Sequence, residues 1–343
     1  METVSCDLCG SDESEVVIRQ QDLLLAVTDE EFTVVRCRHC GLIFLNPRPS
    51  GSLIGTYYPT VYYPPVTAKP LSSSKKRKKF SARTKRWVLE DYYGYPSVDP
   101  AGPIRTLRRV LLWPDKTFRE FMGRHPIPWR GEGKVLDVGC GAGGNLKVLE
   151  EQGWNVSGIE ISSVAAAHAR ALVAGTIHTG TLESAPFAPG SFDLILMNHS
   201  LEHFPSPLDG LRRVRRLLKD DGLLVVSVPN VNSLEVKLFG WWWFGWDPPR
   251  HFYHFGKHTL SRALSQAGFR PFRYRTGTGA VFFMASLDRF WKLRFQKEVP
   301  FRKLIDRLVA RPVSLIAGHF GYGTEMTVYA LKEQADAPGS SSQ

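Results

Sequence analysis

The segment that most constrains the fold is Lys134–Leu146, which reads KVLDVGCGAGGNL. Its apolar residues Val135, Leu136 and Val138 predict a buried parallel strand, because both faces of such a strand are covered. The closely spaced glycines that follow allow a tight turn and a close approach of the backbone to a ligand. A helix expected over Gly144–Gln152 would point its amide-rich end at that ligand. The sequence therefore predicts an α/β protein with a ligand-binding loop after this strand.

The spacing of the glycines differs from that of a dinucleotide site. Gly139, Gly141 and Gly143 stand at alternate positions behind Asp137, whereas the dinucleotide fingerprint is G-x-G-x-x-G. A second short strand is expected over Asn155–Glu160. Its terminal carboxylate lies where the diol of a ribose would need an acceptor for both hydroxyls. The two features together indicate a nucleoside-bearing ligand.

Further elements are expected in alternating order along the chain. Periodicity and apolar runs predict helices over Ser163–Leu172 and Leu208–Leu218, and strands over Thr176–Thr179 and Phe192–His199. A turn expected at Asp221-Gly222 leads into a fifth strand. Strands that alternate with helices predict a doubly wound, mainly parallel sheet.

The order of these motifs, with LEHF at Leu201–Phe204 after the fourth strand, resembles the class I S-adenosylmethionine (SAM) methyltransferases over about residues 131–333. The resemblance implies a Rossmann-like sheet of seven strands, in which the last two, Phe269–Arg275 and Thr324–Leu331, pair antiparallel. It implies an enzyme that binds SAM and transfers its methyl group. The residues that the resemblance places at the cofactor are Asp137, Gly139, Cys140, Gly141, Gly143, Asn145, Glu160, Ile161, Leu182, Asn198 and His199.

One position departs from the pattern of this family. The family's third strand, expected here at Thr176–Thr179, is often followed by Gly-Asp, whose carboxylate bonds the adenine amine. In this chain Gly180 is followed by Thr181. Adenine recognition is therefore expected from packing against Leu182, from Glu183 or from backbone groups.

Four of the five cysteines form two knuckles, Cys6-x2-Cys9 and Cys37-x2-Cys40, with 27 residues between them. Each knuckle is followed by glycine, as in a zinc ribbon. Four thiolates suit tetrahedral Zn²⁺ and leave no open coordination position, so a structural zinc centre is expected. Disulfides fit a cytosolic chain poorly, and redox chemistry of a CxxC motif is the remaining alternative.

The chain is expected to divide into four regions. These are a zinc-ribbon-like module (1–50), a Tyr/Pro-rich arm with a basic linker and cap helices (51–130), the methyltransferase domain (131–333) and a disordered tail (334–343). The net charge of +11 resides in the second region, because residues 69–130 hold 16 Lys and Arg against 5 Asp and Glu. Such a segment suits phosphate, anionic lipid or nucleic acid, and a solvated linker is the plain alternative.

Two insertions in the domain are rich in aromatic side chains. Residues 240–256 include the run GWWWFGW, which suggests a substrate lid, a belt at a membrane interface or ordinary core packing. Residues 281–316 mix aromatic, aliphatic and basic side chains, as in an amphipathic segment that lies on a bilayer.

Methyl transfer to a hydroxyl or a carbon acid needs a base, and three histidines are candidates. His199 stands at the carboxyl end of the fourth strand, where open α/β sheets bind their ligands. His251 lies in the stretch PRHFYHF, which resembles the segment from which related small-molecule O-methyltransferases present a histidine to substrate. His254 lies three residues further on. The expected catalytic residues are therefore His251, His254 and His199.

The combined pattern resembles bacterial methyltransferases of glycan, sugar and quinone-type precursors, and the cysteine module is similar to that of nucleotide-sugar C-methyltransferases. The expected reaction is O-methylation of a sugar, glycolipid or other small-molecule acceptor, with peripheral contact to anionic membrane. An RNA methyltransferase is the first alternative, because the net charge suits a phosphate backbone. A non-catalytic scaffold that binds a partner through the zinc module is the second.

The expected location is the cytoplasm, with the inner membrane face as a peripheral site. The first residues, METVSCDLCG, lack the basic and apolar regions of a signal peptide. No apolar run approaches the roughly 18 residues of a membrane span.

Overall fold

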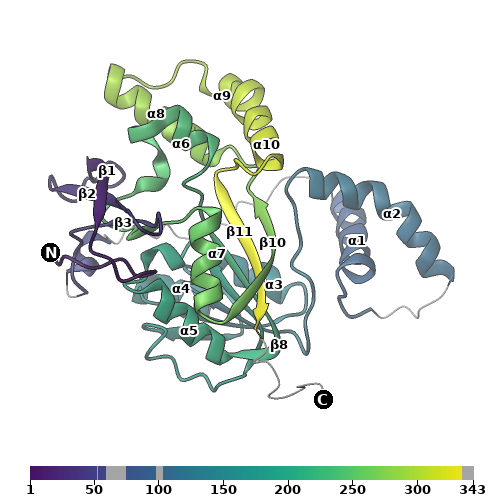
Figure 1. Cartoon of the computed structure of the whole chain (residues 1–343). Helices are drawn as coiled ribbons and strands as arrows, with labels where there is room; N and C mark the ends of the chain where they lie inside the picture. Colours follow the sequence, from purple (N-terminus) through teal and green to yellow (C-terminus); the bar gives the residue numbers. More distant parts are fainter. Residues whose placement is uncertain (52, 59–74, 98–102, 334–343) are drawn as a thin grey trace, which may run out of the picture.

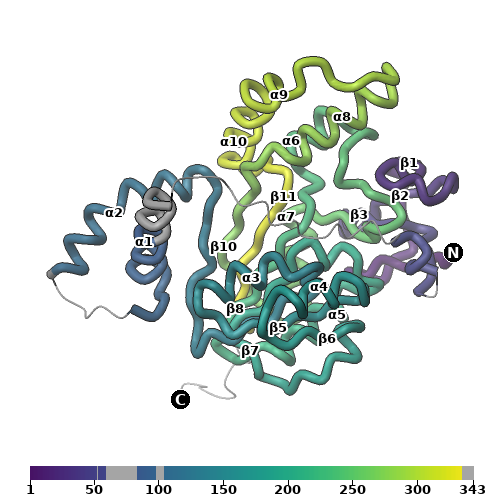
Figure 2. The backbone as a smooth tube through the Cα atoms, turned by 180° about the vertical axis from the view of Figure 1, so that it is seen from behind, coloured from purple at the N-terminus to yellow at the C-terminus, as the bar shows by residue number. Residues whose placement is uncertain are grey.

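The computed structural model describes residues 1–51, 53–58, 75–97 and 103–333. Most elements surround one large sheet, while helices α1 (Lys75–Tyr92) and α2 (Pro103–Phe121) extend from its side (Figures 1 and 2). The expected tail at 334–343 and part of the arm, residues 59–74, lie outside the described residues, whereas the basic run that begins at Lys75 is helical, as the first part of α1.

Seven strands form the large sheet in the order β10-β11-β8-β7-β4-β5-β6. Their bounds are β4 Lys134–Val138, β5 Asn155–Glu160, β6 Thr176–Thr179, β7 Phe192–Asn198, β8 Leu218–Pro229, β10 Phe269–Thr276 and β11 Glu325–Lys332. The strands from β8 to β6 are mutually parallel, and β11 runs antiparallel to both β8 and β10. The predicted doubly wound α/β sheet of seven strands, with an antiparallel final pair, is confirmed.

Helices cover both faces of the sheet because neighbouring strand residues point to opposite sides. Val135 belongs to a core that includes residues of α3 (Gly144–Glu150) and α4 (Ser163–Leu172). The next residue, Leu136, belongs to a second core with α5 (Pro207–Leu217) and α7 (Lys257–Gln266). The continuous apolar character of β4 thus reflects burial on both sides.

The turn expected at Asp221-Gly222 is wrong. Strand β8 is continuous from Leu218 to Pro229, and the irregularity is a shift of register against β7. Phe192 pairs with Leu218, whereas Leu194 pairs with Leu223. An Asp-Gly pair is the usual sequence of a turn, but here the extra residues are accommodated as a bulge.

The four-cysteine region contributes to a second sheet, of order β1-β2-β3-β9. Strands β1 (Ser14–Gln21), β2 (Glu31–Cys37) and β3 (Ile43–Leu45) come from the first 50 residues, but β9 is Tyr253–His254. Ile43 pairs with His254 and Phe44 with Tyr253. The amino-terminal sheet is therefore completed by a segment that follows the fifth strand of the core.

At one end of the large sheet lie helices α6 (Leu234–Phe239), α8 (Val281–Phe295), α9 (Arg302–Ile305) and α10 (Arg311–His319) (Figure 1). The remaining short helical turns are η1 Ile54–Tyr57, η3 Leu201–His203, η4 Gly240–Trp242, η5 Phe244–Trp246 and η6 Asp306–Ala310. In the Trp-rich insertion, Trp243 and Trp246 are buried in the core, whereas Trp241 is 38% exposed. Core packing thus accounts for two of its indoles. Across the described part of the chain, the helices lack the combination of length and apolarity that crossing a bilayer requires.

Candidate functional site

The glycine loop follows β4 and precedes α3. Gly139, Gly141 and Gly143 have positive φ angles of 82°, 53° and 82°, a region that side chains with a Cβ rarely adopt. A Cβ on Gly139 would lie 2.8 Å from the Cβ of Ser200, so this position also needs the small volume of glycine. A Cβ on Gly141 would meet nothing within 4 Å. The loop therefore leaves open space over its centre.

Glu160 ends β5 and fixes the neighbouring turn. Its Oε2 accepts a hydrogen bond from the backbone N–H of Gly141 at 2.9 Å, and its Oε1 accepts one from Ser162 at 2.8 Å. A carboxylate offers about four lone-pair sites, so each oxygen can accept another hydrogen bond. The side chain is held rigidly beside the loop with acceptor capacity to spare.

Asp137 lies at the end of β4, beneath the loop, and is 1% exposed. Its Oδ1 has no hydrogen-bond partner. Burial, and secondarily the negative charge of Glu160, raise the pKa of Asp137 to about 7. A buried acceptor without a donor costs free energy, and a bound ligand could relieve it.

The other predicted cofactor residues lie in the turns after β4, β5 and β6, at the end of β7 or, for Asn145, in α3. Asn145 and Asn198 are exposed, and Ile161 is 66% exposed directly after Glu160. Leu182 and Cys140 are buried in the two cores. These features fit a nucleoside cofactor such as SAM: the loop is open, Glu160 is rigid, and Asp137 has a buried oxygen without a donor. Ile161 adds an exposed apolar side chain.

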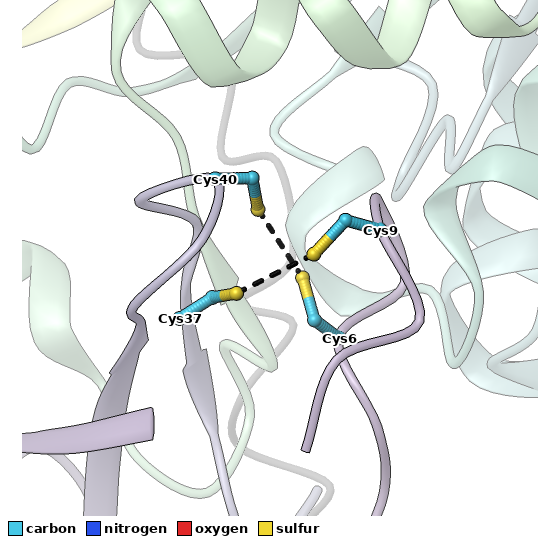
Figure 3. Close-up of side chains that lie close together, drawn as sticks. All are labelled: Cys6, Cys9, Cys37 and Cys40. Carbon is cyan, nitrogen blue, oxygen red and sulfur yellow. Dashed lines mark hydrogen bonds between the residues drawn. The ribbon is translucent and has the colours of Figure 1, made fainter. Parts of the chain in front are cut away.

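The four cysteines of the amino-terminal region converge on one point (Figure 3). The sulfur atoms of Cys6 and Cys40 are 3.4 Å apart, and those of Cys9 and Cys37 are 3.5 Å apart, with no disulfide. All four sulfurs lie within 4.8 Å of one another. Tetrahedral zinc with Zn–S bonds of about 2.3 Å separates its sulfurs by roughly 3.8 Å, so the cluster suits a tetrahedral ion after little adjustment.

His199 lies directly after β7 with a φ of 51°. Its Nε2 is 2.9 Å from Oε2 of Glu325, and its Nδ1 is 3.4 Å from Oε1 of Glu202. Burial disfavours a charged ring, but the hydrogen bonds and charges of the two carboxylates raise the pKa of His199 to about 10. The ring is therefore a cation at the carboxyl edge of the sheet.

His251 and His254 occupy a different place, at the junction between the core and the ribbon. His254 is 2% exposed within β9, and its ring packs edge-on against Trp246 with 5.0 Å between centroids. His251 is 8% exposed and packs against His203, with ring centroids 4.8 Å apart. The rings of His251 and His254 adjoin each other with 6.2 Å between centroids, and Glu202 lies between this pair and His199. The role of base for any of the three stays a prediction.

A buried ion-pair network at this junction was not predicted. Arg250 is fully buried, and its guanidinium donates to Oδ2 of Asp22 at 3.0 Å and to Oδ1 of Asp247 at 3.1 Å. Glu202, which is also fully buried, lies close by. The sequence offered only a weak signal for this network, namely the charged residues within the motifs LEHF and DPPRHF. The pairing with Asp22, which lies far away in the sequence, could not be predicted from it.

A cavity of about 550 Å³ opens where β8, β10 and β11 meet α2 and α10. Its lining includes Asn230 after β8, Lys257 at the start of α7 and Arg275 of β10, together with Phe121 at the end of α2. The ring of Phe121 stacks on His319 of α10 at 4.6 Å. The lining thus combines two cations, Lys257 and Arg275, with the carboxylate of Glu120, and more of its surface is apolar than polar.

Comparison with known proteins identifies the kind of domain. Residues 112–272 match the family model described as "Methyltransferase domain". A ubiquinone biosynthesis O-methyltransferase of Pseudomonas aeruginosa (strain UCBPP-PA14) is 36% identical over 105 residues, which cover 29% of this chain and 45% of the relative. One of Paracidovorax citrulli is 33% identical over 163 residues, 45% of this chain and 61% of the relative.

The chain spans about half the length of the curated relatives that it matches. Among solved structures, a SAM-dependent methyltransferase from Mesorhizobium loti is 20% identical, with a TM-score of 0.43, over 64% of this chain and 97% of that protein.

Proposed function

We propose that the chain is a class I SAM-dependent methyltransferase and that it transfers the methyl group of SAM to an oxygen atom of a sugar, glycolipid or other small-molecule acceptor. The observation that carries this proposal is the glycine loop with Glu160 fixed beside it. The relatives named as ubiquinone biosynthesis O-methyltransferases support oxygen as the methylated atom.

SAM supplies an activated methyl group on a sulfonium, so this protein has mainly to position two reactants. Glu160 would accept hydrogen bonds from the ribose hydroxyls while its amide contacts hold it still. Asp137 would accept a donor from the cofactor at its unpartnered Oδ1. The exposed side chain of Ile161 would pack against the flat face of adenine.

The acceptor side of the site is proposed at the cavity beside α2. Lys257 and Arg275 outnumber the one carboxylate in its lining, Glu120, and suit an acceptor that carries negative charge, such as a phosphorylated one. His199 and Glu325 lie at the same edge of the sheet, since Glu325 precedes the cavity residue Met326. They would contact the acceptor between the cavity and the cofactor.

Helix α2 supports an acceptor that reaches the enzyme from an anionic bilayer. Its exposed apolar side chains include Ile104, Leu107 and Leu111, which are 83%, 61% and 69% exposed. The region around it carries the entire surplus of positive charge. Apolar side chains flanked by cations bind anionic lipid surfaces through burial of apolar area and through electrostatic attraction. Phe121 continues this face to the rim of the cavity.

The four cysteines are proposed to hold a structural Zn²⁺. Four thiolates complete the coordination of the ion and leave no site for a substrate. The ion would link the two knuckles, one of which precedes β1 while the other starts at the end of β2, and it would thereby stabilise the amino-terminal sheet.

Calorimetric titration with SAM tests the cofactor site. Glu160→Ala is expected to weaken binding about 100-fold, since two hydrogen bonds to a charged acceptor are lost at about 1.5 kcal/mol each. Glu151→Ala, an exposed carboxylate at the end of α3, is the matched control and should bind as the native protein does. Unchanged affinity in Glu160→Ala would refute the cofactor site.

The acceptor is tested by transfer of labelled methyl groups from SAM. Lipid extracts, water-soluble sugar fractions and total RNA are offered separately to the native protein. The expected result is label in the lipid or sugar fraction. The label should survive mild alkali, which hydrolyses methyl esters but leaves methyl ethers intact. Label in RNA alone would replace the proposed acceptor class.

A further inference from the structure

Three potential metal ligands meet at the junction between the core and the ribbon. Glu202 and His203 belong to η3, and His251 lies in the loop before β9. A carboxylate oxygen of Glu202 and one ring nitrogen from each histidine lie within 4.8 Å of one another. The group is separate from the four cysteines and from the glycine loop.

Backbone carbonyl groups fix the tautomers of both histidines. Nδ1 of His203 lies 2.9 Å from the carbonyl oxygen of Arg250 and 3.0 Å from the hydroxyl oxygen of Tyr58, and Nδ1 of His251 lies 2.9 Å from the carbonyl oxygen of Gly245. A carbonyl oxygen can only accept, so both Nδ1 atoms donate. In the neutral rings, each Nε2 is then left with a lone pair. Carbonyl-bound Nδ1 is the usual arrangement of a histidine that ligates a metal through Nε2.

The carboxylate of Glu202 is buried beside the cationic ring of His199. The residue is 0% exposed, and neither side-chain oxygen has a hydrogen-bond partner. The nearest ring nitrogen of His199 is 3.4 Å from Oε1. A buried carboxylate normally has several donors, because its desolvation is costly. Here the ring of His199 lies on one of its oxygens, and ring nitrogens of His203 and His251 lie within 4.8 Å of a carboxylate oxygen.

We propose that Glu202, His203 and His251 bind a divalent transition-metal cation. The three groups are all acceptors, and a cation between them would satisfy all three at once, whereas one proton could satisfy only a single pair. Two imidazoles and one carboxylate are ligands typical of Zn²⁺ or Fe²⁺ rather than Mg²⁺ or Ca²⁺. The bound ion would tie η3 of the core to the loop that leads into β9 and the ribbon.

This assignment gives His251 a role different from that of a base. Nε2 of His251 cannot ligate a cation and accept a proton from the methyl acceptor at the same time. Glu202 also contacts His199, so the ion would lie one residue away from the carboxyl edge of the sheet.

Metal content of the full-length protein tests the proposal. After loading with Zn²⁺ and gel filtration, the native chain is expected to retain two equivalents by mass spectrometry, one of them at the cysteines. Glu202→Gln, which keeps the shape of the side chain, and His251→Ala should each retain one. His168→Ala, an exposed histidine of α4, is the matched control and should retain two.

Cobalt provides a second measurement that needs no variant. The first equivalent should show thiolate-to-cobalt charge transfer, and the second should add visible ligand-field bands without it, because its ligands are nitrogen and oxygen. Saturation of the native chain at one thiolate-bound equivalent would overturn the proposal. Retention of two equivalents by Glu202→Gln and His251→Ala would overturn the ligand set.

Discussion

The glycine loop and the junction at Arg250 are both rich in buried charge, but they are assembled in different ways. In the loop, Glu160 bonds Gly141 across 19 residues of sequence. At the junction, Arg250 bonds Asp22 across 228. A site built from consecutive strand ends leaves a motif in the sequence, whereas a site built by closing one sheet with a distant strand does not. A site like the glycine loop can be predicted from its sequence motif, whereas a site like the Arg250 junction can be found only once the strand order is known.

The largest effect is expected from breaking the junction. Arg250→Met should lower the free energy of unfolding by about 3–5 kcal/mol, because two buried carboxylates lose their partner. Urea unfolding followed by circular dichroism measures it. Arg302→Met removes an exposed pair with Asp288 and should cost no more than about 1 kcal/mol. Equal losses in the two variants would show that burial at the junction has no energetic consequence.

Asp137 allows the loop to be probed by pH. A carboxyl group whose pKa rises on folding, from about 3.9 to about 7, binds protons more tightly in the folded state. Stability is therefore lost as pH rises across this window and is constant above it. Asp137→Asn should abolish that loss in the cofactor-free protein. Its advantage over the native chain should grow with pH to about 2–4 kcal/mol near pH 8.

Urea titrations at pH 5, 6, 7 and 8 measure this dependence. An advantage of Asp137→Asn that does not change with pH would mean that the carboxyl group titrates in the same range in both states. Asp115→Asn, a substitution on α2, is the control and should show no such trend.

The open space over the loop separates affinity from stability. Gly141→Ala should weaken SAM binding by about tenfold or more, because its methyl group enters space that the cofactor would use, while the strain of the positive φ costs about 1 kcal/mol. Gly190→Ala carries a similar φ of 64° and also meets nothing within 4 Å. It should show the strain without the loss of affinity. Calorimetry and thermal unfolding distinguish the two, and parallel behaviour of the variants would contradict the proposed cofactor position.

The smallest effect is expected at the surface of α2, far from both regions. Leu107→Asp combined with Leu111→Asp should reduce sedimentation with phosphatidylglycerol vesicles about tenfold, through lost apolar burial and added negative charge. Val16→Asp with Val27→Asp, two exposed sites on the ribbon, is the paired control. Equal binding by both double variants would remove α2 as the membrane contact.

Local patterns predicted most of the core. The expected bounds Ser163–Leu172 and Thr176–Thr179 are those of α4 and β6, because periodicity and short apolar runs are properties of a single segment. Strand β9 has only two residues and could not be found this way. The pairing of Arg250 with Asp22 and the meeting of His203 with His251 follow from β9, so they were equally inaccessible. The bulge in β8 was misread because Asp-Gly is a turn signal whatever sheet surrounds it.

The strand β9 has a consequence for the order in which the protein matures. The cysteine knuckles leave the ribosome before the core strands, yet the sheet beside them lacks its last strand until the polypeptide has been extended past His254. A segment made before the core is therefore completed only after most of the core strands have been made. During synthesis the edge of β3 remains uncovered while five core strands emerge, and the nascent chain must be protected there from pairing with a neighbour.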